Sequence, residues 1–247
     1  MMDKREALRG LYVITDTALI PDDRFAERVE AALRGGARIV QYRDKRRDAG
    51  VRLRLAAELV SLCRTHGALS IINDDVELAA EVAADGVHLG KEDAALGQAR
   101  NRLGQGAVIG VSCYNRLELA LEAAAEGADY VAFGSFFPSR TKPEAVPANM
   151  DLLREARKKL SLPLCAIGGI TADHAAPLIE AGADMLAVIS DVFAAADVEA
   201  AACRYAPLFP SSRRENKMRN QSNAVSSGNA NRPVVTHPVD AHNRPYP

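Results

Sequence analysis

The sequence lacks the features that mark secreted, membrane or nucleic-acid-binding proteins. It has no tryptophan, only 5% aromatic residues and a formal net charge of −1 over 247 residues, which excludes a strongly basic nucleic-acid binder. No apolar run approaches the ~20 residues that span a membrane. The first ten residues lack the apolar stretch of a secretory signal. We therefore expect a cytoplasmic protein with no nucleic-acid and no membrane partner; a homo-oligomer is compatible with the sequence.

Cysteine is also scarce and is not arranged for metal or disulfide chemistry. The four cysteines lie far apart and form no CxxC pair; they are Cys63, Cys113, Cys165 and Cys203. This spacing is not that of a disulfide framework or of a zinc site. We therefore expect reduced thiols.

The composition changes near residue 210. Residues 211–247 contain nine apolar residues in 37 and carry a net charge of +4, while the preceding residues carry −5. A segment with so little apolar surface cannot offset the entropy lost on ordering. We predict a catalytic domain over 1–210 and a disordered tail over 211–247; the alternative is a basic arm for a partner.

The first 210 residues repeat one pattern, a short β-branched run followed by an amphipathic stretch rich in Ala, Leu and Glu. The runs predict eight strands, at 11–16, 38–45, 69–75, 86–90, 108–112, 130–135, 164–169 and 185–190. Apolar spacings of three and four predict intervening helices, among them 25–34, 51–66, 117–126, 152–160 and 174–181. Strands alternating with helices predict a parallel α/β sheet, and we expect a closed (β/α)8 TIM barrel. A doubly wound open sheet is the alternative. The barrel is favoured because polar residues gather at nearly every strand end, as they would around one cavity.

Cations cluster at the end of the second predicted strand. Alternation along the strand places Gln41, Arg43 and Lys45 on one face, at the barrel mouth. Arginine binds phosphate bidentately and lysine acts as a point charge, so this face suits a polyanion. Ser112, at the end of the fifth strand, offers a hydroxyl to a phosphate oxygen; an ordinary turn serine is the alternative. A basic strand end on the surface is the alternative.

Carboxylates follow the third and fourth strands. Asp74 and Asp93 can share one hard cation, because neighbouring strands lie ~4.8 Å apart. Carboxylates without Cys or paired His favour Mg²⁺, which also accepts substrate phosphate as a ligand. Helix capping by each Asp is the alternative. His88 is interpreted as a structural strand histidine. Beside the cations of the second strand, the pair predicts one Mg²⁺ ion with a diphosphate.

A second anion site is predicted at the last three strands. The long loop after the sixth strand offers two hydroxyls and an ammonium, from Ser139, Thr141 and Lys142. Barrels often bind phosphate at the seventh and eighth loops through backbone N–H groups, and Gly169 and Ser190 stand there. Two anion sites across one mouth predict group transfer between two phosphorylated ligands.

These motifs resemble those of the thiamine phosphate synthase family over about residues 11–193. The matching segments, in the same order and spacing, are QYRDK, INDD, DGVHLGKED, GVS, FPSRTKP, AIGGI and VIS. The resemblance implies a (β/α)8 transferase that uses Mg²⁺. Such an enzyme condenses 4-amino-2-methyl-5-(diphosphomethyl)pyrimidine with 4-methyl-5-(2-phosphoethyl)thiazole by dissociative substitution, giving thiamine phosphate and diphosphate.

The resemblance also implies roles for individual residues. Those that would hold the pyrimidine diphosphate are Gln41, Tyr42, Arg43, Asp44, Lys45 and Asn73. Those that would hold the thiazole phosphate are Ser139, Arg140 and Thr141, with backbone groups of Gly169, Ile189 and Ser190. The catalytic contacts to the diphosphate would come from Arg43, Lys45, Ser112 and Lys142, and the Mg²⁺ ligands would be Asp74 and Asp93. The chain departs from the family at Asp191, where a small residue is usual and a carboxylate is unfavourable unless it points away.

Three alternatives share the barrel. A thiazole tautomerase-like isomerase does not need the diphosphate and metal half of the site. A pentose-phosphate epimerase would explain the seventh and eighth loops but not the side predicted to bind Mg²⁺ and diphosphate. A ligand sensor without catalysis is excluded by no sequence feature.

Overall fold

The computed structural model describes residues 4–90, 95–138 and 146–209, and its eight strands form a closed parallel barrel. The strands are β1 (Gly10–Ile14), β2 (Ile39–Tyr42), β3 (Leu69–Asn73), β4 (Gly86–Leu89), β5 (Val108–Tyr114), β6 (Tyr130–Phe133), β7 (Leu164–Ile167) and β8 (Met185–Val188). Each pairs with the next, and β8 closes on β1 with Ala187 opposite Tyr12. This closure confirms the predicted barrel and rules out the open sheet.

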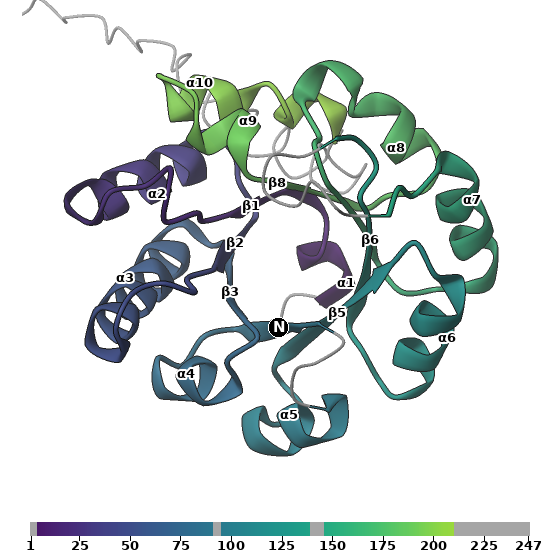
Figure 1. The fold of residues 1–247 in the computed structure, drawn as a ribbon, viewed down its shortest axis with the longest axis horizontal. Helices are drawn as coiled ribbons and strands as arrows, with labels where there is room; N and C mark the ends of the chain where they lie inside the picture. Colours follow the sequence, from purple (N-terminus) through teal and green to yellow (C-terminus); the bar gives the residue numbers. More distant parts are fainter. Residues whose placement is uncertain (1–3, 91–94, 139–145, 210–247) are drawn as a thin grey trace, which may run out of the picture. The chain divides into compact units, whose positions relative to one another are not determined.

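Helices surround the barrel as an outer ring, except the first, which lies within the ring of strands in this view (Figure 1). The α-helices are α1 (Lys4–Ala7), α2 (Phe25–Arg34), α3 (Ala49–His66), α4 (Val76–Glu81), α5 (Leu96–Leu103), α6 (Leu117–Ala125), α7 (Met150–Lys159), α8 (Ala176–Glu180), α9 (Ser190–Phe193) and α10 (Val198–Cys203). The 3-10 turns are η1 (Asp22–Arg24), η2 (Ala172–His174) and η3 (Ala206–Leu208). The predicted helix at 25–34 matches α2. Helix α3 begins two residues before the prediction, because the Asp48 carboxylate accepts a hydrogen bond from the N–H of Val51 at 3.0 Å.

Most strands end earlier than the sequence predicts. The second was expected over 38–45, yet β2 ends at Tyr42. The chain turns there because the Asp44 carboxylate accepts the backbone N–H groups of Arg46 and Arg47, at 2.9 and 3.1 Å. Strand β5 is the exception: it runs on to Tyr114, with an irregular register between Ser112 and Tyr114.

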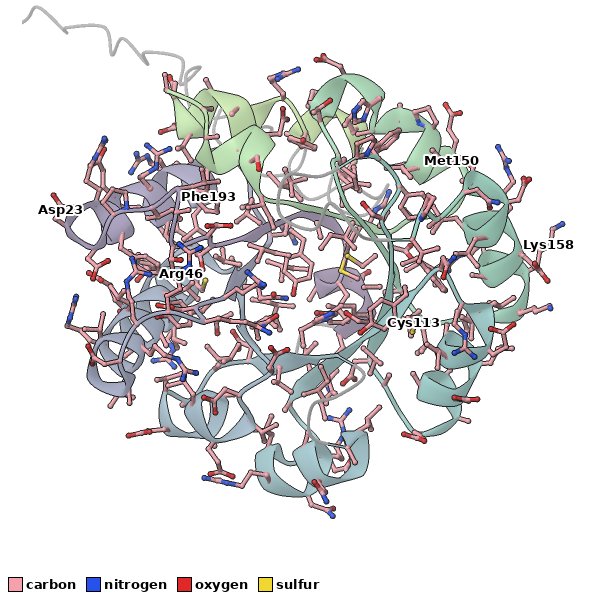
Figure 2. The ribbon with its side chains drawn as sticks, viewed as in Figure 1. Asp23, Arg46, Cys113, Met150, Lys158 and Phe193 are labelled. Atoms are coloured by element: carbon pink, nitrogen blue, oxygen red, sulfur yellow. The ribbon has the colours of Figure 1, made fainter. Side chains whose placement is uncertain are left out.

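The apolar residues form two cores, one between the barrel and its helices and one inside the barrel. Figure 2 shows charged side chains such as Asp23 and Lys158 on the outer rim. Inside the barrel, Leu8 is 1% exposed. The nearby α1 is anchored by Lys4, whose ammonium donates to the carbonyls of Gln105 and Ala107, at 3.0 and 2.9 Å. Because these carbonyls directly precede β5, the N-terminal segment closes the end of the barrel where the strands begin.

Aspartates that bond to neighbouring strands stabilise the same end of the barrel, where the strands begin. Asp129 stands just before β6, and its carboxylate accepts the N–H of Ile109 in β5 at 2.8 Å. Asp184 precedes β8 and accepts the N–H of Leu164 in β7 at 2.8 Å. The positions that precede strands are therefore structural, which leaves the opposite end for the ligand site.

Within 4–90, 95–138 and 146–209, no helix is long and apolar enough to cross a membrane. The predicted tail over 211–247 lies outside these ranges.

Candidate active site

All eight strands open into one cavity of about 940 Å³, a size suited to small-molecule ligands. Every strand contributes a lining residue; in strand order they are Tyr12, Gln41, Asn73, His88, Ser112, Ala132, Cys165 and Ala187. The expectation that the strand ends face a common cavity is confirmed.

One side of the cavity, which we call the side-chain wall, consists of Gln41, Arg43, Asn73, His88 and Ser112. Four of these are predicted site residues. Arg43 follows β2, and its backbone N–H donates to the Thr15 hydroxyl at 2.9 Å. Its half-buried guanidinium takes part in no ion pair with another residue that the structure describes. The positive charge of Arg43 is therefore available to a ligand.

A chain of hydrogen bonds runs beneath this wall through five strands. The amide Nε2 of Gln41 donates to the Tyr12 hydroxyl at 2.6 Å, and the hydroxyls of Tyr12 and Tyr130 lie 2.9 Å apart. The Tyr130 hydroxyl lies 2.9 Å from His88 Nδ1, and His88 Nε2 lies 2.8 Å from Ser112 Oγ. Both ring nitrogens of His88 thus have protein partners, in keeping with its interpretation as structural. Desolvation by burial raises the pKa of both tyrosines, so both hydroxyls remain protonated.

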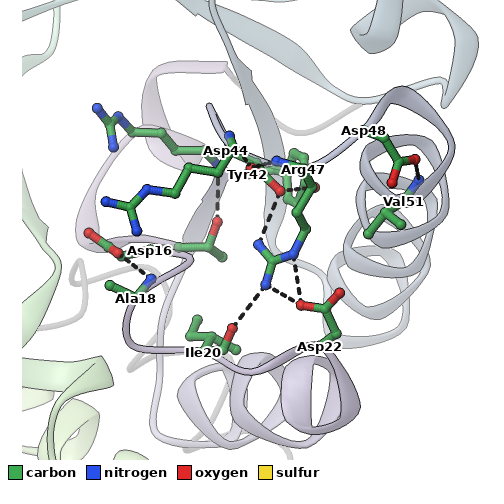
Figure 3. A network of polar contacts seen from close by, with 12 residues as sticks. Asp16, Ala18, Ile20, Asp22, Tyr42, Asp44, Arg47, Asp48 and Val51 are labelled. Carbon is green, nitrogen blue, oxygen red and sulfur yellow. Dashed lines mark hydrogen bonds and ion pairs between the residues drawn. The ribbon is translucent and has the colours of Figure 1, made fainter.

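The predicted ligand residues Tyr42 and Asp44 lie outside the cavity lining and order the turn after β2 (Figure 3). The Asp44 carboxylate accepts from the Tyr42 hydroxyl and the Arg47 guanidinium, each at 3.1 Å, and from two backbone N–H groups. Burial alone would raise the pKa of Asp44, but the hydrogen bonds from Arg46 and Arg47 lower it on balance. Arg47 also binds Asp22, which ties this turn to the loop after β1. The strand ends at Tyr42 and not at 45; Gln41 and Arg43 line the cavity together as expected, and Lys45 is not among the lining residues.

Lys45 and Asp74 form an ion pair of 3.1 Å beside the cavity lining. The Lys45 side chain is 62% exposed and that of Asp74 is 27% exposed. The N-cap of α4 is Asp75, whose carboxylate accepts the N–H of Leu78 at 2.9 Å, so Asp74 is not the capping residue. Asp74 instead presents a partly exposed carboxylate oxygen, which suits a hard cation.

Several predicted residues lie outside the described ranges: Asp93, Ser139, Arg140, Thr141 and Lys142. Among the residues that are described, no three His, Cys, Asp or Glu side chains form a metal-binding group. The predicted Mg²⁺ site rests on Asp74 and a partner beyond these residues.

The opposite side, which we call the backbone wall, consists of Gly168, Gly169, Ile189 and Ser190. Gly168 and Gly169 have positive φ angles of 104° and 60°. The N–H of Phe137 donates to the Gly168 carbonyl at 3.0 Å, and a Cβ on Gly169 would overlap the Pro138 carbonyl oxygen. These glycines are therefore required for packing against the loop after β6, in addition to the predicted approach to a ligand.

Asp191, the residue that departs from the family pattern, is held by protein donors. Its carboxylate accepts from the Tyr205 hydroxyl at 2.6 Å and from the N–H of Ala172 at 3.2 Å. Tyr205 is fully buried, and its burial and the adjacent carboxylate raise its pKa. Asp191 lies at the rim of the cavity, where these bonds occupy one carboxylate oxygen.

Sequence reasoning missed several residues that line the cavity. Tyr114 is the last residue of β5, with a φ of 55°, and Asn115 and Arg116 follow it. The polar run CYNR directly after Ser112 was the available signal. Tyr12, which lines the cavity, and Tyr130, which bonds to it beneath the wall, were missed because an aromatic residue within a strand is more often part of an apolar core.

Known proteins resemble the chain along most of its length. A family model described as thiamine monophosphate synthase matches residues 11–192. The thiamine-phosphate synthase of Thioalkalivibrio sulfidiphilus is 55% identical over 209 residues, which is 85% of this chain and 99% of that relative. The thiamine-phosphate synthase of Nitrosococcus oceani is 51% identical over 205 residues, covering 83% and 94%. A solved structure of the thiamine phosphate pyrophosphorylase from Pyrococcus furiosus has a TM-score of 0.76 and 38% identity, covering 83% of this chain and 97% of that one.

Proposed function

The chain belongs to the thiamine monophosphate synthase family, and on that premise we propose that it condenses the pyrimidine and thiazole halves of thiamine. The substrates would be 4-amino-2-methyl-5-(diphosphomethyl)pyrimidine and 4-methyl-5-(2-phosphoethyl)thiazole, and the products thiamine phosphate and diphosphate. The observation that carries the proposal is one cavity with a cationic, hydroxyl-bearing wall facing a backbone wall.

The reaction is a substitution at the pyrimidine methylene carbon. The bond from this carbon to a diphosphate oxygen breaks, and its electron pair leaves with the diphosphate. The thiazole nitrogen then supplies the electron pair of the new carbon–nitrogen bond. No proton has to be removed from either reacting atom, so the protein supplies charge stabilisation and orientation rather than a strong base.

The side-chain wall suits the diphosphate. The Arg43 guanidinium stabilises the charge that grows on the leaving oxygen, and Ser112 and Asn73 offer polar groups at the same cavity. Lys45 and Lys142 would add positive charge from the loops. The backbone wall, with Ser139, Arg140 and Thr141, would hold the thiazole phosphate and so orient the nucleophilic nitrogen.

A divalent cation fits the donor chemistry of Asp74, whose carboxylate is partly exposed and not used as a helix cap. Asp74 and Asp93 would hold one Mg²⁺, which when bound neutralises charge on the diphosphate. Because Lys45 already binds Asp74 at 3.1 Å, the cation would compete with this ammonium for the carboxylate.

The test is formation of thiamine phosphate from the two purified substrates, with Mg²⁺ and with a chelator. We expect product only with Mg²⁺, and a severe loss of rate in Asp74→Ala and Asp93→Ala with the barrel still folded. Product at an equal rate with chelator would contradict the metal assignment. No product from folded protein would contradict the reaction, and isomerisation of the thiazole phosphate alone would indicate the tautomerase instead.

A further inference from the structure

We propose that Gln41, acting through Tyr12, Tyr130 and His88, fixes the direction of the Ser112 hydroxyl so that its proton is donated into the cavity. Gln41, Tyr12, Tyr130 and His88 are then positioning residues for Ser112. The inference rests on the proposed function only for the identity of the acceptor, the anionic diphosphate.

The donor and acceptor of each hydrogen bond from Gln41 to His88 follow from counting the protons that each group carries. The Gln41 Nε2 group can only donate, so the Tyr12 oxygen accepts from it at 2.6 Å. Each tyrosine has a single hydroxyl proton. The arrangement that uses every hydroxyl proton has Tyr12 donating to Tyr130, and Tyr130 donating to His88 Nδ1, each over 2.9 Å. With the Gln41 NH2 group on Tyr12, any other arrangement leaves a buried hydroxyl proton without an acceptor.

The tautomer of His88 is thereby set. When Nδ1 accepts from Tyr130, the neutral ring carries its proton on Nε2, which donates to Ser112 Oγ over 2.8 Å. The hydroxyl proton of Ser112 is then not needed by His88. Because Ser112 lines the cavity, this proton is available to an acceptor there, and an anion is a strong acceptor.

A rotated Gln41 amide would reverse every bond. Tyr12 would donate to the amide oxygen, and the sequence would end with Ser112 donating to His88 Nε2. Ser112 would then offer only lone pairs to the cavity and would repel a diphosphate. The tautomer of His88 distinguishes the two orientations, because only the bond from the Gln41 NH2 group to Tyr12 places the ring proton on Nε2.

Because the hydrogen-bonded residues between them are buried, the Gln41 amide can determine the direction of the Ser112 hydroxyl. Tyr12 is 1% exposed, and Tyr130 is fully buried. The rings of Tyr12 and Tyr130 meet edge to face at 6.1 Å, and His88 stacks on Tyr130 at 5.6 Å. Water therefore cannot compete for the two phenols, and their raised pKa values keep both protons in place.

The test is the tautomer of His88, measured by NMR on protein with ¹⁵N-labelled histidine and assigned with a His88→Gln variant. We expect the neutral ring with its proton on Nε2. A ring protonated on Nδ1 would overturn the inference.

The Gln41→Glu substitution replaces the donor at the start of the hydrogen-bond chain with an acceptor. An ionised carboxylate only accepts, so Tyr12 must donate to it, and we expect the His88 proton to move to Nδ1. The spectra are taken at pH 9 to 10, above the pKa of about 8–9 documented for buried glutamates. Gln98→Glu, on the exposed face of α5, is the matched control and should leave the tautomer unchanged. A proton that stays on Nε2 in a folded Gln41→Glu protein would contradict the proposal.

The double variant Tyr12→Phe/Gln41→Glu separates transmission along the chain from a direct effect on the site. Without the Tyr12 hydroxyl, the double variant should have the same His88 tautomer as the Tyr12→Phe single variant. A difference between them would show that Tyr12 does not transmit the effect of the Gln41 substitution. In the thiamine phosphate assay we expect Gln41→Glu to lower kcat/KM about tenfold to a hundredfold, as for one hydrogen bond to a charged acceptor. Wild-type protein that makes no thiamine phosphate would refute the proposed function alone, because the tautomer is read without substrate.

Discussion

The two walls of the cavity carry their polar groups in different ways. On the side-chain wall, residues such as Arg43 and Ser112 present functional groups from strand ends whose backbone is already paired in the barrel. On the backbone wall, Gly168 and Gly169 hold positive φ angles and pack against the loop after β6. A substitution on the side-chain wall can therefore change activity without changing stability, whereas a substitution on the backbone wall affects both.

The largest expected effect is that of Arg43→Ala on the side-chain wall. The variant removes the cavity's half-buried guanidinium, and we expect kcat/KM for thiamine phosphate formation to fall about 10²–10³-fold. Thermal unfolding should be nearly unchanged, because the only described bond of Arg43 is made by its backbone. Arg46→Ala, at an exposed arginine three positions along the chain, is the control and should keep its activity. An equal loss of kcat/KM in the two variants would show that Arg43 acts through the overall positive charge of this region and not by contact with the ligand.

On the backbone wall, Gly169→Ala should lower the free energy of unfolding by about 1–3 kcal/mol, measured by urea denaturation. The residue has a φ of 60°, and the added Cβ would meet the Pro138 carbonyl. Gly97→Ala, in α5 where a Cβ has open space, should stabilise the protein by about 0.5–1 kcal/mol. If Gly169→Ala were as stable as wild type but inactive, the separation between the two walls would not hold.

Asp44→Asn tests the turn that supports the side-chain wall. The pKa of Asp44 is lower in the folded protein than in the unfolded chain. Its ionised form therefore stabilises the fold above the unfolded pKa of about 3.9, and this contribution is lost as the pH falls through the lower folded pKa. We expect a cost of about 1–3 kcal/mol at pH 7. The difference from wild type should shrink below pH 4, whereas Asp151→Asn, with an 86% exposed side chain, should show little difference at any pH.

The smallest expected effect concerns the thiols. Burial raises the pKa of Cys63 and of Cys113 to about 12 and also raises that of Cys165, which lines the cavity between the walls. Cys203 is exposed. A thiol reagent should modify Cys203 alone in the folded protein and all four cysteines in denaturant, with activity retained. Rapid modification of Cys165 would indicate that the cavity is deeper and more open than described.

The sequence predicted the barrel and part of the side-chain wall, for a definite reason. A polar residue at the end of a parallel strand has only the common mouth to occupy, so Gln41, Asn73 and Ser112 line the cavity. Lys45 is not among the lining residues, because the turn at Asp44 ends β2 before it. The pairing of Tyr12 with Tyr130 was not predictable, since it depends on the closure that brings residues of β1 and β6 together across the interior.

The barrel is closed at the end where its strands begin, and this determines how ligands enter and leave. Leu8 and the anchored α1 fill the end where the strands begin, so the described structure offers no passage through the barrel. Molecules that meet in this cavity arrive and depart by the same opening. The occupant nearest the barrel interior cannot leave before the one above it, so the fold imposes a last-in, first-out sequence on any pair of ligands stacked along the barrel axis.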